Sequence, residues 1–504
     1  MHDGKMQDVE KDDLSSNEDL QEEKSRLPIY DIEEEENTCT KDTKKNRSCH
    51  GNQQMWLCVL GCALAHFVLG GFERSNGVLF LHIQDRYGAG ASDIAWVISL
   101  SVTLKLLFGP VASILCTKLA PRCVVMIGTV LFSLGVLLTA NFLNFTLLFL
   151  SYGIIAGIGK SLAYQPGLVV VGQHFTKKRG IAVGLATAGG GIGTLILPPL
   201  FEVLLTIYGF SGGLLILSGV ALQICVSGML YGDPGLKKQE QPVRSSEDEC
   251  TNKSSIETAN VADLQVMEIS DSNLKTTSKK RHKFWISKCF YSCHTIQERN
   301  HPKRKFNLVL LKKPEFFLFC LGIGLLALSF NSLLVFIPPL AHSRGLRGVE
   351  GAYIMSVAGV FDTVGRIASG FILEAKRLRM VRKIIYNGVM FFLAIVIFSL
   401  PFVVTFIEFC VVAALFGLLI GTYTSQKSVI LADIAGSEEL NSSFGILIFF
   451  QGVGTLLGPP ITGIFKDVYN SYEDGFYFIG GITFLGSFVL LLSNTIKSAK
   501  KHCT

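Results

Sequence analysis

Two ionisable residues, Asp362 and Arg366, lie in an otherwise apolar segment in the second half of the chain. Residues four positions apart in an α-helix lie on one face, one turn apart, so these two side chains can pair. An arginine presents a planar fork that binds a carboxylate through two hydrogen bonds, and a carboxylic acid can carry a proton. The pair could therefore hold an anion and a proton. The alternative is a buried ion pair that only fixes the packing of helices.

Four more cations occur inside apolar segments. Arg74 directly follows Glu73, and neighbouring residues on a helix do not face each other. Arg74 is therefore a second candidate to bind an anionic substrate, unless it reaches the membrane surface or pairs with another carboxylate. Lys105, Lys160 and Lys427 lie deep in other apolar segments. Because a charge at the centre of a membrane helix costs about 2.5–3.5 kcal/mol, these lysines are candidates to line a cavity, or else they pair with carboxylates or carbonyls.

Residues for enzymatic chemistry are missing from the sequence. It has no P-loop and no nucleophile elbow, and Cys289, Cys293 and His294 make a poor zinc site. We therefore predict no enzymatic activity, no cofactor, no bound metal and no transport driven by ATP hydrolysis.

The composition indicates a membrane protein. Of 504 residues, 49% are hydrophobic and only 17% are charged, too few to cover a soluble globule of this size. The apolar residues fall in long runs, such as 124–140 and 391–404, which approach the ~20 residues that cross a bilayer as a helix. The net charge of +6 comes from short basic clusters beside these runs, a pattern typical of a protein in a lipid bilayer and not of one that binds nucleic acid.

The chain divides into five predicted parts. Residues 1–54 are an acidic disordered tail, 55–232 a first half of six helices, 233–313 a flexible linker, 314–496 a second half of six helices, and 497–504 a short tail. The predicted spans are 55–81, 93–116, 124–140, 145–171, 180–208, 212–231, 315–341, 351–373, 384–402, 406–431, 442–465 and 476–493. This all-α arrangement of twelve transmembrane helices in two halves resembles the major facilitator fold, whose halves rock about a site near the bilayer midplane.

The basic residues of the loops predict the orientation. Those that fall on one side are Lys118, Arg122, the clusters 177–179 and 377–383, and the basic residues of the linker. The opposite loops carry fewer, namely Arg86, Arg344 and Arg347. Since Lys and Arg accumulate in cytoplasmic loops, we expect both termini and the linker in the cytosol.

One segment carries a family resemblance. Residues 173–189 read QHFTKKRGIAVGLATAG, which resembles the signature with which the monocarboxylate transporter family enters its fifth span, His174 standing for an aromatic residue and Ile181 for leucine. The sequence Gly-Ile-Gly at 157–159 and the sequence Gly-Pro-Pro-Ile-Thr-Gly at 458–463 also resemble that family, as do Asp362 and Arg366 followed by Gly370. The likeness extends from about residue 56 to about residue 491.

The resemblance implies roles for individual residues. Asp and Arg of the family's eighth span serve proton and carboxylate binding, which implies these roles for Asp362 and Arg366. The signature that opens the family's first span is degraded here, with only Trp56 retained, and the lysine that many members have in that span corresponds to Arg74. Because arginine stays protonated in proteins, any coupling proton is expected on Asp362. Lys105 and Lys160 stand where uncharged residues are expected in lactate carriers, which favours a different substrate.

These observations predict a transporter in the plasma membrane that moves a small monocarboxylate with a proton by alternating access. A single-span glycoprotein chaperone is a possible further partner, as for several members of that family. Two alternatives stay open: uncoupled movement of a larger carboxylate or zwitterion, and a sensor or scaffold that does not transport.

Overall fold

The computed structural model describes residues 55–142, 144–175, 179–231, 308–373, 375, 378, 381–435 and 440–502. The predicted tail 1–54, most of the predicted linker, residues 503–504 and the possible zinc ligands at 289–294 lie outside the described residues. The same holds for Thr176, Lys177 and Lys178 of the family signature.

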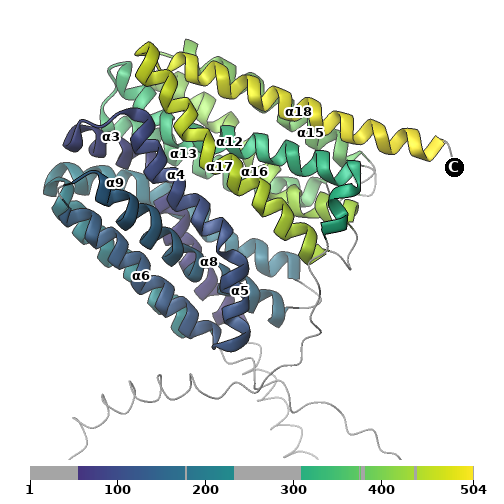
Figure 1. The fold of residues 1–504 in the computed structure, drawn as a ribbon, viewed down its shortest axis with the longest axis horizontal. Coiled ribbons are helices and arrows are strands. Elements are labelled where there is room, and N and C mark those ends of the chain that lie inside the picture. Colours follow the sequence, from purple (N-terminus) through teal and green to yellow (C-terminus); the bar gives the residue numbers. More distant parts are fainter. Residues whose placement is uncertain are drawn as a thin grey trace, which may run out of the picture. The chain divides into compact units, whose positions relative to one another are not determined.

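Every described element is a helix (Figure 1). The first half has a helix over Met55–Arg74, then α3 (Asn76–Tyr87), α4 (Ala91–Leu107), α5 (Gly109–Lys118), α6 (Pro121–Asn141), α7 (Thr146–Leu148), the π-helix η1 (Phe149–Ile155), α8 (Ala156–His174), α9 (Arg179–Leu222) and α10 (Ile224–Leu230). The second half has η3 (Leu308–Lys312), α12 (Pro314–Ser343), α13 (Gly348–Ile372), α15 (Arg382–Ser399), η4 (Leu400–Phe402), α16 (Phe406–Ala435), α17 (Leu440–Tyr469) and α18 (Glu473–His502).

Ten helices in the described part are long and apolar enough to cross a membrane. One of them, Gly184–Leu230, has 47 residues, more than twice the ~20 residues of a single crossing. Within it Gly209 adopts φ 68° and ψ 176°, a conformation that glycine tolerates and that divides the segment at the boundary predicted between the fifth and sixth spans. Helix α13 is not among these ten, but it has 25 residues, includes the Asp362–Arg366 pair and corresponds to the predicted eighth span. Each predicted span is therefore covered by one or more described helices.

The helix ends differ from the predicted span ends in several places, for example at Ser75, which divides the predicted first span into the helix Met55–Arg74 and α3. The predicted second span is divided at Phe108, where α4 ends and α5 begins with Pro110 in its first turn. Proline lacks the amide hydrogen that would continue the hydrogen-bond ladder, which accounts for the break. The last helix, α18, continues to His502 and so includes most of the stretch 497–504 that was predicted as a tail.

Glycines allow the helices to approach closely at the centre of the fold. A Cβ atom on Gly189 or Gly193 of α9 would lie 2.1 Å from the carbonyl oxygen of Ala63 or 1.9 Å from that of Phe67, both on the first helix. The glycine-rich run of α9 therefore lets two helix backbones pack closely. On α16, a Cβ atom on Gly421 would lie 2.2 Å from the carbonyl oxygen of Asp362, so this glycine sets the position of the Asp362 backbone.

The two halves contact each other through the pairs α4 and α17, α9 and α13, and α3 and α12. At one end of the first pair, the Asp467 carboxylate of α17 accepts hydrogen bonds from the backbone amides of Ala91 (2.8 Å) and Ser92 (2.9 Å) in the first turn of α4. A carboxylate is stabilised at a helix N-terminus by the unpaired amides and the helix dipole. This cap joins the second half to the first.

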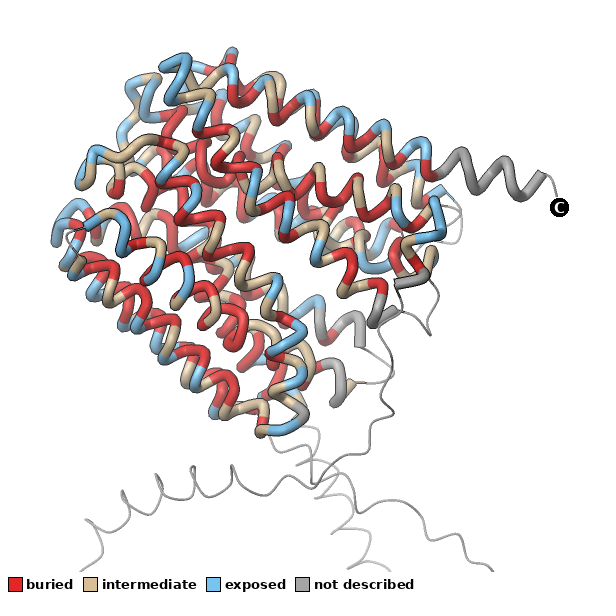
Figure 2. Tube along the Cα trace, in the orientation of Figure 1, coloured by how far each residue is buried: buried red, intermediate tan, exposed pale blue. Residues whose placement is uncertain are grey.

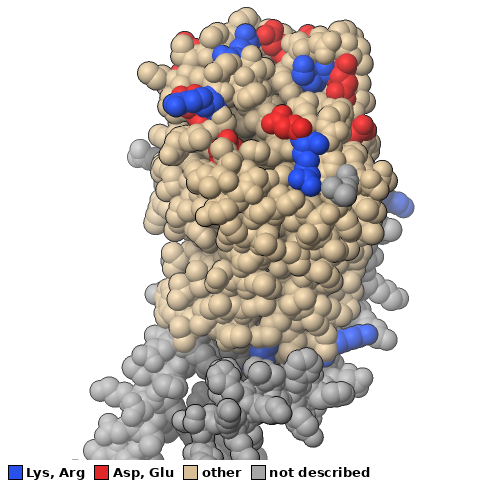
Figure 3. Space-filling model, turned by 90° about the vertical axis from the view of Figure 1, so that its left-hand side faces the viewer, with Lys and Arg blue, Asp and Glu red and all other residues tan. Residues whose placement is uncertain are grey.

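Apolar side chains cover the outer surface of the described helices. Among the most exposed are Phe371 (78%), Phe402 (73%) and Ile407 (73%), while the buried residues face other helices (Figure 2). On the face drawn in Figure 3, charged side chains gather toward one end, and a broad uncharged band lies beneath them. Such a band matches the hydrocarbon core of a bilayer.

Candidate functional site

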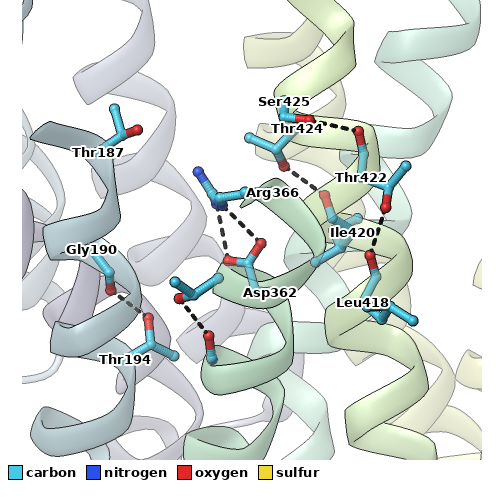
Figure 4. Close-up of polar contacts among 12 residues, drawn as sticks. Thr187, Gly190, Thr194, Asp362, Arg366, Leu418, Ile420, Thr422, Thr424 and Ser425 are labelled. Atoms are coloured by element: carbon cyan, nitrogen blue, oxygen red, sulfur yellow. Dashed lines mark hydrogen bonds and ion pairs between the residues drawn. The ribbon is translucent and has the colours of Figure 1, made fainter. Parts of the chain in front are cut away.

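Asp362 lies at the centre of the candidate site. The residue is 2% exposed. Its carboxylate accepts two hydrogen bonds from Arg366, one from Nε (2.9 Å) and one from Nη2 (3.0 Å). Figure 4 shows the Arg366 side chain on the same helix as Asp362, with both bonds drawn between them. The predicted pairing of these two residues across one helical turn is confirmed.

A second arginine reaches the same carboxylate from the other half of the molecule. Arg74 Nη2 donates to Asp362 Oδ2 at 3.0 Å across a sequence separation of 288 residues. Its guanidinium also lies 5.1 Å from the centre of the Phe330 ring, a cation–π contact. Its other terminal nitrogen, Nη1, is buried and has no hydrogen-bond partner in the described part of the chain. Of the alternatives for Arg74, the structure therefore contains the pair with another carboxylate, and one donor remains unused.

Glu73 pairs with Lys105 of α4 and not with its neighbour Arg74. The distance from Lys105 Nζ to Glu73 Oε1 is 2.5 Å, and the ammonium lies 4.4 Å from the centre of the Tyr164 ring. Adjacent residues project from a helix about 100° apart, so Glu73 and Arg74 take partners on different neighbouring helices. The Lys105–Glu73 pair has no net charge.

Lys427 of α16 has an uncharged partner. Its Nζ donates to Oε1 of Gln451 on α17 at 2.8 Å and lies 5.8 Å from the centre of the Tyr423 ring. No carboxylate within the described ranges forms an ion pair with it. Its positive charge is therefore not balanced by a direct anionic neighbour there.

Lys160, predicted to line a cavity, lies inside the helix packing instead. It is fully buried, donates from Nζ to Ser101 Oγ at 3.0 Å, and lies 4.5 Å from the Tyr152 ring and 5.3 Å from the Phe132 ring. The preceding residue, Gly159, packs so closely on α6 that a Cβ atom there would lie 2.3 Å from the backbone nitrogen of Phe132. This rotation of α8 directs position 160 toward α4 and α6.

A cavity of about 270 Å³ lies between the two halves. Its ionisable lining residues are Glu73, Arg74, Lys105, Arg366 and Lys427, and its uncharged polar and aromatic ones include Tyr164, Gln165, Phe330, Asn331, Tyr423 and Gln451. The lining therefore contains four cations and one carboxylate, Glu73. Asp362, which is bonded to Arg74 and Arg366, adds a second carboxylate. An excess of positive charge in a largely apolar cavity suits an anionic ligand.

Sequence reasoning missed the uncharged members of this site. Asn331 and Gln451 are polar residues inside apolar spans, a signal that points to a cavity in the same way as a charge does. Tyr164 and Phe330 carry no such signal because aromatic residues are frequent throughout the spans. For metals, the described residues contain no cluster of three or more His, Cys, Asp or Glu side chains that could hold an ion.

A comparison with known protein families identifies the superfamily to which the fold belongs. A family model described as "Major Facilitator Superfamily" matches residues 62–425 and 379–502. The chain belongs to the major facilitator superfamily. This is a family of membrane transporters, and in this major facilitator protein the candidate cavity lies between the two halves, where such folds have their substrate sites.

Individual relatives narrow the comparison. "Monocarboxylate transporter 12" of Mus musculus is 26% identical over 446 residues, which cover 88% of this chain and 86% of that protein. "Monocarboxylate transporter 1" of Homo sapiens is 27% identical over 448 residues, covering 87% and 84%. "Monocarboxylate transporter 9" of Gallus gallus is 28% identical over 477 residues, covering 87% and 92%. The resemblance predicted from the signature is confirmed, and this major facilitator protein is similar to these transporters over both halves.

Proposed function

We propose that the protein is a secondary active transporter that moves a small monocarboxylate together with a proton across the plasma membrane by alternating access. The observation that carries this proposal is the Asp362 carboxylate shared by Arg74 of the first half and Arg366 of the second. The names of the relatives support the substrate class.

The shared carboxylate links proton binding to substrate binding. In the empty carrier, ionised Asp362 occupies hydrogen bonds of both guanidinium groups. A substrate carboxylate at the cavity wall competes for the same donors and repels Asp362. Protonation of Asp362 removes that repulsion and releases donors of Arg74 and Arg366 to the substrate, so each ligand strengthens binding of the other.

The same three residues also link binding to movement of the halves. The Arg74–Asp362 bond joins the first helix to α13. Releasing this bond when the proton and the substrate bind removes one restraint between the halves. The loaded carrier can then rock. Its net charge at these three residues equals that of the empty carrier, because the proton and the anion cancel, whereas the proton alone or the anion alone changes that charge by one unit.

Localisation and topology complete the proposal. We infer that both termini and the stretch 233–313 face the cytosol, from the basic clusters of the loops. An epitope tag inserted after Asn260 is expected to be reached by antibody only after cells are permeabilised. Labelling of that tag on intact cells would show the opposite orientation.

A single-span glycoprotein is proposed as an accessory partner for delivery to the surface, and co-expression tests it.

A second candidate function is uncoupled transport of a larger carboxylate or a zwitterion. Glu73 on the cavity wall favours it, because a carboxylate there can meet the ammonium group of a zwitterion if Lys105 yields. The two functions differ in their response to protons.

The deciding experiment measures uptake of labelled carboxylates into proteoliposomes. With no other gradient, an inward proton gradient is expected to drive accumulation above equilibrium by the symporter. Uptake that reaches only equilibrium at every pH gradient would favour the uncoupled carrier, and no saturable uptake of any carboxylate would reject both.

A further inference from the structure

The cavity has its positive charge in two places. Arg74 and Arg366 share one carboxylate, which leaves one surplus positive charge beside Asp362. Lys105 is balanced by Glu73. The second surplus charge belongs to Lys427, whose partner in the described part of the chain is the Gln451 amide.

The Lys427 site is built from donors that face the cavity. Lys427 and Gln451 both line it, and they come from different helices, α16 and α17. With one hydrogen of the ammonium directed to Gln451 Oε1, the other ammonium hydrogens and the Gln451 Nε2 group are available to an acceptor. The positive charges of Arg366 and Lys105 also repel the Lys427 ammonium, so an acceptor at Lys427 offsets that repulsion.

Helix register places Lys427 on the same wall of the cavity as Arg366. Gly421 of α16 packs against the Asp362 carbonyl, and Lys427 follows six residues later, a rise of about 9 Å along the helix. Helix α13 runs in the same direction, since Ser369 Oγ and Ser425 Oγ are hydrogen-bonded at 2.6 Å, so Arg366 also lies beyond Asp362 on the side of Lys427. The lysine ammonium lies over the Tyr423 ring, and both cations line the cavity, so one short ligand can contact both. Apolar side chains, among them Val102, Leu334 and Ile448, line the same cavity and suit a short carbon chain between the two ends of a ligand.

We propose that Lys427 and Gln451 form a second binding site for oxygen atoms, so that the preferred substrate is a carboxylate with a further oxygen acceptor at its far end. This inference rests on the proposed transport of a carboxylate and refines its chemical class to an oxo acid or, if the distal group is a second carboxylate, to a dicarboxylate in place of a monocarboxylate. The carboxylate is bound by Arg366 and Arg74, and the distal group, a carbonyl or a second carboxylate, is bound by Lys427 and Gln451. A simple alkanoate would leave the lysine charge without an acceptor.

The first test compares three acids of equal carbon count as competitors and as labelled substrates of the wild-type protein in proteoliposomes. Pentanoate has no distal acceptor, levulinate has a distal carbonyl, and glutarate has a distal carboxylate. We expect the better of levulinate and glutarate to exceed pentanoate in apparent affinity by about tenfold, the equivalent of one or two good hydrogen bonds. Which of the two is better shows whether the second site takes a neutral or a charged oxygen. Equal or stronger competition by pentanoate would overturn the inference while leaving carboxylate transport intact. If none of the three is transported, the proposed function fails first and the inference falls with it.

The second test asks whether Lys427 causes the preference. Lys427→Met keeps the length of the side chain and removes its charge and its donors, and Gln451→Leu does the same for the amide. We expect each variant to lose most of the wild-type preference for the acid with the distal oxygen over pentanoate, whatever its absolute rate of transport. Because the readout is a ratio of two substrates in one variant, reduced expression does not change it. Lys466→Met serves as the control, since Lys466 donates to the Asn470 carbonyl oxygen at the end of α17 and does not line the cavity. An unchanged ratio in Lys427→Met and Gln451→Leu would overturn the proposal.

Discussion

Arg366 combines a fixed charge with a fixed geometry. Two of its nitrogens bind both oxygens of Asp362, and its side chain is still about 30% exposed to the cavity. The planar fork holds two acceptors in set directions, which a lysine ammonium cannot reproduce. Position 366 therefore requires the shape of a guanidinium group as well as its positive charge.

We expect Arg366→Lys to lower saturable carboxylate uptake by at least about tenfold, because the bidentate interaction is worth more than a single charged hydrogen bond. Uptake per transporter at the surface measures this. Arg347→Lys is the matched control, since the Arg347 side chain is 83% exposed and forms its ion pair in the described part of the chain with Glu350, three residues later. Near-normal uptake in Arg366→Lys would remove the guanidinium from the substrate site.

Asp362 is the residue to which we assign the coupling proton in the proposed cycle, with Arg74 and Arg366 as its cationic partners. In the proposed cycle, protons bind to the carrier together with the substrate, so uptake is expected to rise as external pH falls. An asparagine in its place mimics the neutral acid but leaves Arg366 without its carboxylate in the empty carrier.

We expect Asp362→Asn to lose this pH dependence and net proton movement. Exchange of internal for external substrate should survive better than net uptake, because exchange does not require the empty carrier to return. Parallel uptake and exchange measurements across a pH series test both statements. Asp362→Asn that still accumulates substrate against a proton-driven gradient would show that the coupling proton binds elsewhere.

At the scale of the elements, two helices hold the carboxylate in place. Gly417 and Gly421 of α16 leave room for α13, and a Cβ atom at these positions would lie 2.3 Å from the Ala358 carbonyl oxygen and 2.2 Å from the Asp362 carbonyl oxygen. Contacts this short are relieved only if one helix moves. A methyl group far from any ligand can therefore displace the ionic site.

We expect Gly421→Ala to destabilise the protein by roughly 1–3 kcal/mol, the usual effect of overpacking, and to reduce uptake beyond the loss of folded protein. Thermal unfolding of the purified protein and uptake per surface transporter measure the two effects. Gly388→Ala on α15 is the control, because nothing lies within 4 Å of a Cβ atom there. In a helix interior, alanine at that position should be neutral or stabilising. Equal behaviour of the two variants would mean that α16 has more room than the structure indicates.

At the scale of the whole molecule, the conformation depends on contacts between the halves. The Asp467 carboxylate caps the N-terminus of α4 from α17, so the two hydrogen bonds persist only while the halves lie together at this end. Alternating access requires this end to open. The cap therefore stabilises one conformation relative to the other.

We expect Asp467→Ala to cost about 1 kcal/mol of this conformation, the usual effect of losing a cap, and to raise the maximal rate of substrate exchange severalfold. Glu408→Ala is the control, because Glu408 also accepts two backbone hydrogen bonds, from Val404 and Thr405, but within one half. Both variants should lower the melting temperature to a similar degree, and only Asp467→Ala should change the exchange rate. Identical exchange rates in the two variants would contradict a role for the cap in the conformational equilibrium.

The helices and the local side-chain pairs follow from the sequence alone. A span needs ~20 apolar residues in a row, and such a run can be recognised from neighbouring residues alone. Each predicted span is accordingly covered by described helices. Asp362 and Arg366 are four residues apart, and the helical period alone brings them together. A glycine-rich run such as that of α9 is typical of a close approach of two backbones, but the run itself does not identify the partner helix.

Contacts between side chains of different helices depend on the tertiary structure. Arg74 reaches Asp362, Lys427 reaches Gln451, and Lys160 turns into the helix packing and away from the cavity. The rotation of each helix about its axis selects these partners, and that rotation follows from close packing across helices distant in the chain. In a span that is apolar on all sides, the hydrophobic pattern does not distinguish the face toward lipid from the face toward the cavity, so the sequence named the charged residues of the site but not its walls.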